Sequence, residues 1–373
     1  MLSMVRRSLL FVVCTCACTF AVLAVVPWSM SRIPVVPKPM MYVPDDQSVD
    51  AVLSGYRARR VEAMNVSRPR SLVCVLDDRL GFANKMMHIS SCVAFSILTD
   101  RALHFDWDEY TLPTFLYVCN MLIFGEDMWS HSSYDSLFQT FFTDVRTVGR
   151  DLQPMGPTNT FRLEAGMAAD TPGHLLYEQG MELLAKEDLD ETFKARTLYV
   201  KGWNFWCKPL FSNPRYQGTA LVALGAERFF AASCRAVFRP RFHVSSPLKC
   251  GWVLQYRAHQ AYYATAHLKS FEQCARQNGF DSARGGFNVL ISDSHATVEG
   301  FQSLEVGCRT GFHCDVEAIR QMYLASTCEN AVLTSMSTFG QVAAAMGNAT
   351  NVWMVRADGA CVRKQGRLPD NEE

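Results

Sequence analysis

The chain has 373 residues, 36 basic against 36 acidic side chains, 49% hydrophobic residues and 14 cysteines. This apolar content is too high for a disordered chain, and neutral charge without a basic block argues against a nucleic-acid-binding protein. The length allows two domains, and the cysteines are too sparse for a small disulfide-stapled domain.

A stretch of 19 residues without a charged side chain, residues 8–26, follows Arg6 and Arg7. In a helix this stretch would rise about 28 Å, close to the roughly 30 Å hydrocarbon thickness of a bilayer. It predicts a transmembrane anchor after a cytoplasmic tail at 1–7, and the two arginines favour a lumenal position for the rest of the chain. A cleaved signal peptide and an organelle presequence are the alternatives.

The segment after the anchor, residues 27–70, is rich in proline and lacks a sustained period, which predicts an extended stem. Glycosylation triplets begin at Asn65 and Asn348, in agreement with a lumenal location. Three of the 14 cysteines lie in the anchor, which leaves 11. In an oxidising lumen at least one of these is unpaired, and the sequence does not determine the pairing.

Folding is expected to begin near Ser71. The apolar run 71–75 predicts a buried strand, 84–98 a helix and 102–105 a second strand, which together form a βαβ unit with parallel strands. The aromatic-rich region from about 111 to 246 is predicted only to be globular and largely helical.

Strands and helices alternate in the last third of the chain. Strands are predicted at 252–256, 287–291, 331–333 and 352–355, and helices at 261–277, 316–325 and 339–346. This alternation predicts a parallel, doubly wound sheet. The predicted fold class is therefore α/β, with two Rossmann-like domains facing a cleft, at 71–246 and 247–361, and a tail at 362–373.

Polar residues follow the predicted strands, where ligands of open α/β sheets bind. They include Arg257, Asp293, His295 and a hydroxyl-rich run from Thr334 to Thr338. An arginine and several hydroxyls at one sheet edge suit a phosphate-bearing anion. An arginine at a buried strand end needs a negative partner, and an acid of the chain would serve as well as a ligand.

The hydroxyl-rich run leads into the predicted helix 339–346. Thr338 and Gln341 have the spacing of a capping box, which predicts that the Thr338 side chain caps the helix, and Gly347 is predicted to end it. The free amides of the first turn suit a diphosphate, although a capped helix without a ligand fits the same residues.

Asp106 and Asp108 form a D-x-D pattern after a predicted strand. This pattern would hold a divalent cation on a nucleotide-sugar diphosphate, and a solvated or capping role is the alternative. The sequence contains no G-x-G-x-x-G, P-loop, G-x-S-x-G or H-E-x-x-H motif, which argues against a classical dehydrogenase, an NTPase, an α/β-hydrolase and a zinc protease.

Several motifs resemble the plant xyloglucan fucosyltransferase family. The longest joins AIRQMYLA at 318–325 to LTSMSTFGQVA at 333–343, and shorter ones lie in the family's order at 80–85, 98–103, 210–214 and 253–257. The resemblance spans roughly residues 71–361. Lys85 stands where the family has arginine, and Met336 where it has tryptophan, which puts the acceptor in doubt rather than the donor.

The resemblance implies a GT-B-like fold and an inverting enzyme that moves fucose from GDP-fucose to a glycan, usually to the 2-hydroxyl of galactose. It also implies no metal or other cofactor, a type II orientation in the Golgi membrane through residues 8–26, and frequent homodimerisation. The other functions that the sequence leaves open are a metal-dependent glycosyltransferase that uses Asp106 and Asp108, and a lumenal glycan-binding module without turnover.

The resemblance also implies roles for particular residues. Arg257 would bind the donor diphosphate and stabilise the leaving group, and Asn84 would face the cleft. The residues that would line the nucleotide pocket are Thr334, Ser335, Ser337, Thr338 and Phe339. The general base is undecided among residues at strand ends, namely Asp77, Asp78, His259, Asp293 and His295.

Overall fold

The computed structural model describes residues 51–56, 58, 70–76, 81–107, 155–156, 158–163, 177–202, 204–237, 250–258, 266–305, 318, 321–335, 337–347, 349–366 and 368–369. The predicted anchor and the glycosylation sites Asn65 and Asn348 lie outside these residues. Within the ranges given, the structure has no helix with the length and apolar character needed to cross a membrane.

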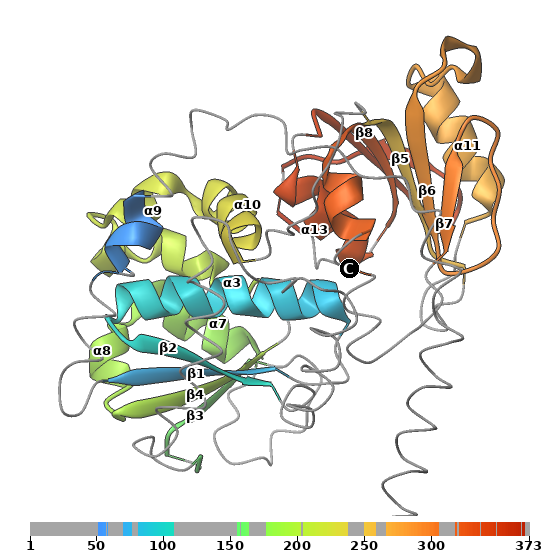
Figure 1. Ribbon diagram of the computed structural model, residues 1–373. Helices are drawn as coiled ribbons and strands as arrows, with labels where there is room; N and C mark the ends of the chain where they lie inside the picture. Colours follow the sequence, from blue (N-terminus) through green and yellow to red (C-terminus); the bar gives the residue numbers. More distant parts are fainter. Residues whose placement is uncertain are drawn as a thin grey trace, which may run out of the picture. The chain divides into compact units, whose positions relative to one another are not determined.

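The first sheet has four parallel strands in the order β2-β1-β4-β3 (Figure 1). The strands are β1 (Ser71–Leu76), β2 (Ala102–Trp107), β3 (Thr160–Leu163) and β4 (Thr197–Gly202). The helix α3 (Phe82–Leu98) connects β1 to β2, so the predicted βαβ unit is confirmed. Strands β3 and β4 were not predicted, and they lie in the region predicted to be largely helical.

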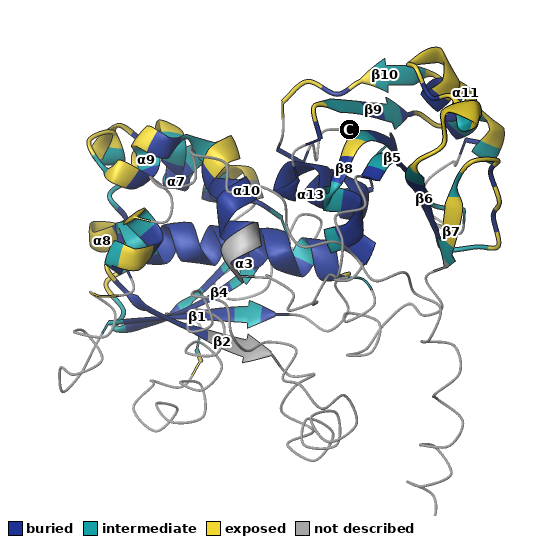
Figure 2. Ribbon diagram, turned by 45° about the horizontal axis from the view of Figure 1, so that its top comes forward, coloured by how far each residue is buried: buried dark blue, intermediate teal, exposed yellow. Residues whose placement is uncertain are grey.

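Helices and short 3₁₀ turns make up most of the other described elements of this part of the chain. They are α7 (Tyr177–Lys186), α8 (Leu189–Thr192), α9 (Ala220–Leu224), α10 (Ala226–Val237), η2 (Lys208–Ser212) and η3 (Pro214–Tyr216). The helix α3 is buried along most of its length, as Figure 2 shows. Aromatic rings of this region lie in the core, where Phe161 and Phe95 meet the Trp206 indole edge-on, as expected for residues whose role is packing.

One helical segment of the predicted stem packs against this sheet. Residues 51–56 are helical, and Leu53 and Tyr56, three positions apart, are buried. The Tyr56 hydroxyl donates to the Arg101 carbonyl oxygen at 2.8 Å and accepts from the Leu103 N–H at 3.1 Å. Apolar side chains three positions apart share one helix face, which explains the docking.

The second sheet has six strands in the order β10-β9-β8-β5-β6-β7, and all its pairs are parallel except β10 with β9. The strands are β5 (Cys250–Tyr256), β6 (Phe287–Ser292), β7 (Gln302–Glu305), β8 (Cys328–Thr334), β9 (Asn351–Val355) and β10 (Cys361–Arg363). The four predicted strands are confirmed. The short edge strands β7 and β10 were not predicted.

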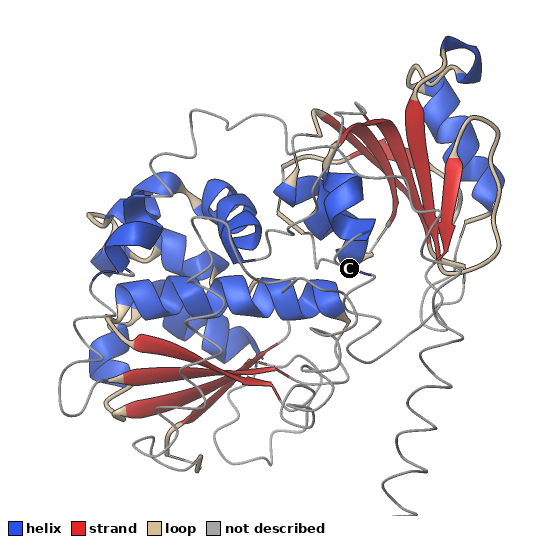
Figure 3. Cartoon of the chain, viewed as in Figure 1, coloured by secondary structure: helices blue, strands red, loops and turns tan. Residues whose placement is uncertain are grey.

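Two helices cover opposite faces of this sheet (Figure 3). The helix α11 (Leu268–Gln277) packs on β5, β8 and β9, over a core that contains Leu254 and Val332. The helix α13 (Thr338–Met346) packs on β8 near Leu333, whose side chain points to the other face. Residues 318 and 321–326 are helical, and Ser282–Arg284 form the 3₁₀ turn η4.

The start of α11 differs from the prediction at 261. The helix begins at Leu268, and His267 is its extended N-cap. Its buried residues are Phe271, Cys274 and Ala275, so the helix covers only the stretch that has an apolar stripe with helical spacing.

The chain order of the second sheet creates a switch point. From β5 the chain proceeds outward through β6 to β7, and then crosses back to place β8 on the other side of β5. This is the 3-2-1-4-5-6 order of doubly wound sheets, in which ligands bind where the order reverses, beyond the carboxyl ends of the two central strands. Here those strands are β5 and β8.

Two disulfides join parts of the second sheet. Cys250–Cys328 links the first residues of β5 and β8, and Cys274–Cys361 links α11 to β10. Disulfides of this kind are typical of proteins that fold in an oxidising compartment. Among the described residues Cys74, Cys92, Cys207 and Cys234 are buried thiols.

Replacing both Cys250 and Cys328 with alanine is expected to lower the free energy of unfolding by about 2–5 kcal/mol. The crosslink closes a long loop, because its cysteines are 78 positions apart. Urea denaturation under non-reducing conditions measures the effect. The control is Cys234→Ala, which removes a buried thiol and no crosslink, and equal losses in the two variants would contradict the prediction.

Candidate functional site

The candidate site lies at the switch point, where residues from four elements meet. Arg257 follows β5, Asp293 follows β6, Thr334 ends β8 and Phe339 lies in the first turn of α13. The Arg257 backbone N–H donates to the Thr334 hydroxyl at 3.1 Å, and the Arg257 guanidinium carbon lies 5.4 Å from the centre of the Phe339 ring. The structure thus brings together residues that the sequence analysis placed at one sheet edge.

Thr334 holds the ends of β5 and β8 together. Its hydroxyl donates to the Gln255 backbone oxygen at 2.9 Å, and its own N–H donates to Gln255 Oε1 at 3.2 Å. Both side chains are buried. The Thr334 hydroxyl therefore has a structural task, which is to fix the position of the backbone that carries Arg257.

Gln255 in turn depends on a glycine of α13. A Cβ at Gly340 would lie 2.9 Å from Gln255 Oε1 and 3.0 Å from Leu333 Cδ2. The missing side chain thus lets α13 approach the strand ends closely. Neither residue was predicted to have a role, although the sequence holds two signals: a glutamine in an otherwise apolar strand, and a glycine in the first turn of a helix.

Arg257 and Asp293 form an ion pair with a long distance of 3.8 Å between Arg257 Nη1 and Asp293 Oδ2. The side chains are only 22% and 15% exposed. Burial lowers the pKa of Arg257, and the charge of Asp293 offsets part of that shift. Arginine remains charged at neutral pH despite such a shift.

The Arg257 guanidinium has unused hydrogen-bonding capacity. It carries five N–H donors, and in the described part of the chain it makes an ion pair and a ring contact but no hydrogen bond. Asp293 compensates the charge only at a long distance of 3.8 Å, and burying the remaining donors without a hydrogen-bond acceptor is costly. The geometry therefore suits an anionic ligand at this edge.

The start of α13 differs from the predicted capping box. Thr338 is the first helical residue and Ser337 is the N-cap, without a side-chain capping bond. The Ser337 and Ser335 N–H groups donate to the Thr334 and Val355 carbonyl oxygens, so these amides already have acceptors. The box prediction is wrong because the helix starts one residue earlier than the box requires: Ser337, whose N–H bonds to Thr334, takes the N-cap position that was predicted for Thr338.

The first turn of α13 still offers amides to a ligand. Gln341 is the first residue whose N–H reaches back along the helix, to the Ser337 oxygen at 3.2 Å. The three preceding amides, of Thr338, Phe339 and Gly340, have no acceptor four positions earlier within the helix. Gly347 follows the helix as predicted, and a Cβ there would collide with the Ser326 carbonyl.

Of the other predicted site residues, the structure describes only some. Asn84 lies in the first turn of α3, and its Oδ1 is shielded from solvent without a hydrogen-bond partner in the described structure. His295 is exposed after β6. The residues Asp77, Asp78, His259 and Asp108, and the Asp106 side chain, lie outside the described part.

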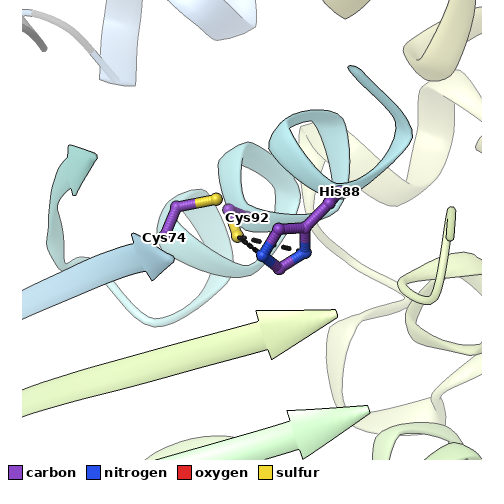
Figure 4. Close-up of side chains that lie close together, drawn as sticks. All are labelled: Cys74, His88 and Cys92. Carbon is purple, nitrogen blue, oxygen red and sulfur yellow. Dashed lines mark hydrogen bonds between the residues drawn. The ribbon is translucent and has the colours of Figure 1, made fainter. Parts of the chain in front are cut away.

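A buried Cys/His cluster lies elsewhere, between β1 and α3 (Figure 4). Ligand atoms of Cys74, His88 and Cys92 are all within 4.8 Å of one another. The Trp206 indole N–H donates to His88 Nδ1 at 2.8 Å, so a neutral His88 carries its proton on Nε2. Neither ring nitrogen then offers a free lone pair to a metal ion, and the cluster is better described as hydrogen-bonded core.

Comparison with solved structures found matches at low sequence identity. A mutant form of Arabidopsis thaliana FUT1 in complex with GDP is 15% identical, with a TM-score of 0.49 over 89% of this chain and 86% of that chain. NodZ alpha-1,6-fucosyltransferase soaked with GDP-fucose is 14% identical, with a TM-score of 0.41 over 80% of this chain and 100% of that chain. Fucosyltransferase NodZ from Bradyrhizobium is 13% identical, with a TM-score of 0.42 over 80% of this chain and 99% of that chain. No protein-family model and no curated protein matches the chain.

Proposed function

We propose that the chain is an inverting, metal-independent glycosyltransferase that transfers fucose from GDP-fucose to a glycan hydroxyl. One observation carries the proposal: a largely buried Arg257 with donors unused among the described residues stands at the switch point of a doubly wound sheet, close to Phe339 in the first turn of α13. The motif resemblance around Arg257 and α13 supports the choice of donor. The proposed architecture is GT-B-like, with Rossmann-like domains at 71–246 and 247–361.

The proposed chemistry follows from where charge develops. As the bond from fucose to GDP breaks, the sugar gains oxocarbenium character and negative charge accumulates on the β-phosphate. The Arg257 fork can donate two hydrogen bonds to phosphate oxygens, and the partial positive charge of the α13 N-terminus adds to it. Groups fixed in place before the reaction stabilise this charge without reorganisation.

The acceptor and the location follow from the resemblance and the predicted anchor. We propose the 2-hydroxyl of a galactose residue as acceptor and a type II orientation in the Golgi membrane. The two disulfides support an oxidising compartment. The candidates for the base that accepts the proton of the acceptor hydroxyl are still Asp77, Asp78, His259 and His295.

Thermal unfolding of the full chain in detergent with GDP, UDP and CMP, each with and without EDTA, tests the donor. At a hundredfold excess over its dissociation constant, a ligand of the folded state stabilises it by about 2.7 kcal/mol. We expect an increase in melting temperature with GDP only, unaffected by EDTA. An increase with UDP that EDTA removes would favour the metal-dependent alternative, and GDP binding without transfer from GDP-fucose to any glycan would favour a binding module.

A further inference from the structure

Asp293 contacts the residue pair that follows β5 through both carboxylate oxygens. Asp293 Oδ1 accepts from the Ala258 backbone N–H at 2.6 Å, and Oδ2 lies 3.8 Å from Arg257 Nη1. The Asp293 side chain is 15% exposed, and it enters from the end of β6, the strand next to β5. A single carboxylate thus spans two strand ends, holding the backbone beside Arg257 and lying against its guanidinium.

The contacts leave most of the guanidinium available. Asp293 lies near Nη1, and the Phe339 ring lies 5.4 Å from the guanidinium carbon. The Nε and Nη2 donors have no partner among the described residues. They lie on one edge of the guanidinium and can donate two parallel hydrogen bonds to a phosphate. An arginine whose rotamers are already restricted loses less entropy when it binds an anion.

We infer that Asp293 is a positioning residue for the donor site: it orients Arg257 toward the diphosphate and does not act as the general base. The inference rests on the proposed function. A base must offer an oxygen to the acceptor hydroxyl, whereas both oxygens of Asp293 face the Arg257–Ala258 pair. Loss of Asp293 would therefore weaken donor binding rather than remove proton transfer.

Two substitutions separate the contacts of this carboxylate. Asp293→Asn keeps an oxygen acceptor for the Ala258 N–H and removes the charge, and Asp293→Ala removes both. The control is Asp358→Asn, another aspartate that accepts a backbone N–H, from Ala360 at 2.9 Å in an exposed turn. For the full chain, GDP affinity is measured by calorimetry, and kcat, donor KM and the pH profile of kcat by fucosyl transfer.

We expect GDP affinity to fall about threefold to tenfold in Asp293→Asn and on the order of tenfold to hundredfold in Asp293→Ala, with donor KM rising in parallel. The kcat at saturating donor should change by less than about tenfold, and the shape of its pH profile should be unchanged. Asp358→Asn should behave like the wild type. If Asp293→Ala fails to fold, Asp293→Asn carries the test.

A double-substitution cycle checks that Asp293 acts through Arg257. In an Arg257→Ala background, adding Asp293→Asn should weaken GDP binding no further. Three results would overturn the inference: unchanged GDP affinity with kcat reduced about 10³-fold and one limb of its pH profile lost, wild-type behaviour of both Asp293 variants, or additive losses in the cycle. Failure of the wild type itself to bind GDP would instead refute the proposed function on which the inference rests.

Discussion

Replacing Arg257 with alanine is expected to lower the rate of fucosyl transfer by about 10²–10³-fold, the usual cost of removing one donor to developing negative charge. The side chain is 22% exposed and already paired with Asp293, so no solvent cation substitutes for it readily. The variant would leave Asp293 close to the diphosphate without a compensating charge, which adds repulsion to the lost hydrogen bonds. Initial rates with GDP-fucose at saturating acceptor measure the effect.

Arg257→Lys is expected to recover little of this loss. Lysine keeps the charge, but its ammonium is a point donor that cannot bind two phosphate oxygens as a fork. Recovery of less than about tenfold relative to alanine is expected. Arg284→Ala, at an arginine whose side chain is 81% exposed, is the matched control. Near-wild-type rates in both Arg257 variants would refute the assignment of the leaving-group role.

The position of Arg257 was predictable because it follows from strand order and from the rule that ligands bind beyond strand ends. The hydrogen bonds that fix its position were not predictable. Thr334 uses its hydroxyl on Gln255 and on the Arg257 backbone, and Gly340 provides space for the Gln255 side chain. These contacts depend on the register of β5 against β8 and on the approach of α13, neither of which the spacing of residues reveals.

The missed elements have a related cause. Strands β7 and β10 are four and three residues long, at the edges of the second sheet. A strand this short shows too few alternations to be read as a pattern, and its pairing is determined by the neighbouring strand. In the first sheet β4 has only two β-branched residues, Thr197 and Val200, and ends in lysine and glycine, so its sequence gives a weak strand signal.

A second motif residue, Arg101, has a different task from Arg257. It lies in the segment 98–103 that resembles the fucosyltransferase family, directly before β2 and only 1% exposed. Its Nη1 donates to the Ala195 carbonyl oxygen at 2.8 Å and to the Ser71 carbonyl oxygen at 3.3 Å. Arg101 therefore joins the starts of β1, β2 and β4 at the amino edge of the first sheet, away from the strand ends at which ligands bind.

Arg101 keeps its charge in this cage of backbone carbonyl oxygens. Burial, reinforced by the nearby charge of Arg70, lowers the pKa of Arg101 to about 10, which is still well above neutral pH. The cation is held by backbone carbonyl oxygens, and further ones come from Phe193 and Arg196. Removing the side chain would take this donor from the part-buried Ala195 and Phe193 oxygens, whereas the Arg196 oxygen still accepts from the Ser71 N–H at 2.8 Å. Each unsatisfied group costs about 1–3 kcal/mol.

Replacing Arg101 with methionine, which fills similar volume without donors, is therefore expected to lower the free energy of unfolding by about 3–5 kcal/mol. Arg101→Lys should recover only part of this, because a single ammonium cannot reach carbonyls that a planar fork joins. Urea denaturation measures both, and the control is Arg363→Met, at an exposed arginine bonded to Asn351. Because the cage lies at the amino edge of its own sheet, opposite the strand ends at which ligands bind, GDP affinity of the folded fraction should be unchanged. A methionine variant as stable as the control but with impaired GDP binding would mean that Arg101 serves the ligand rather than the fold.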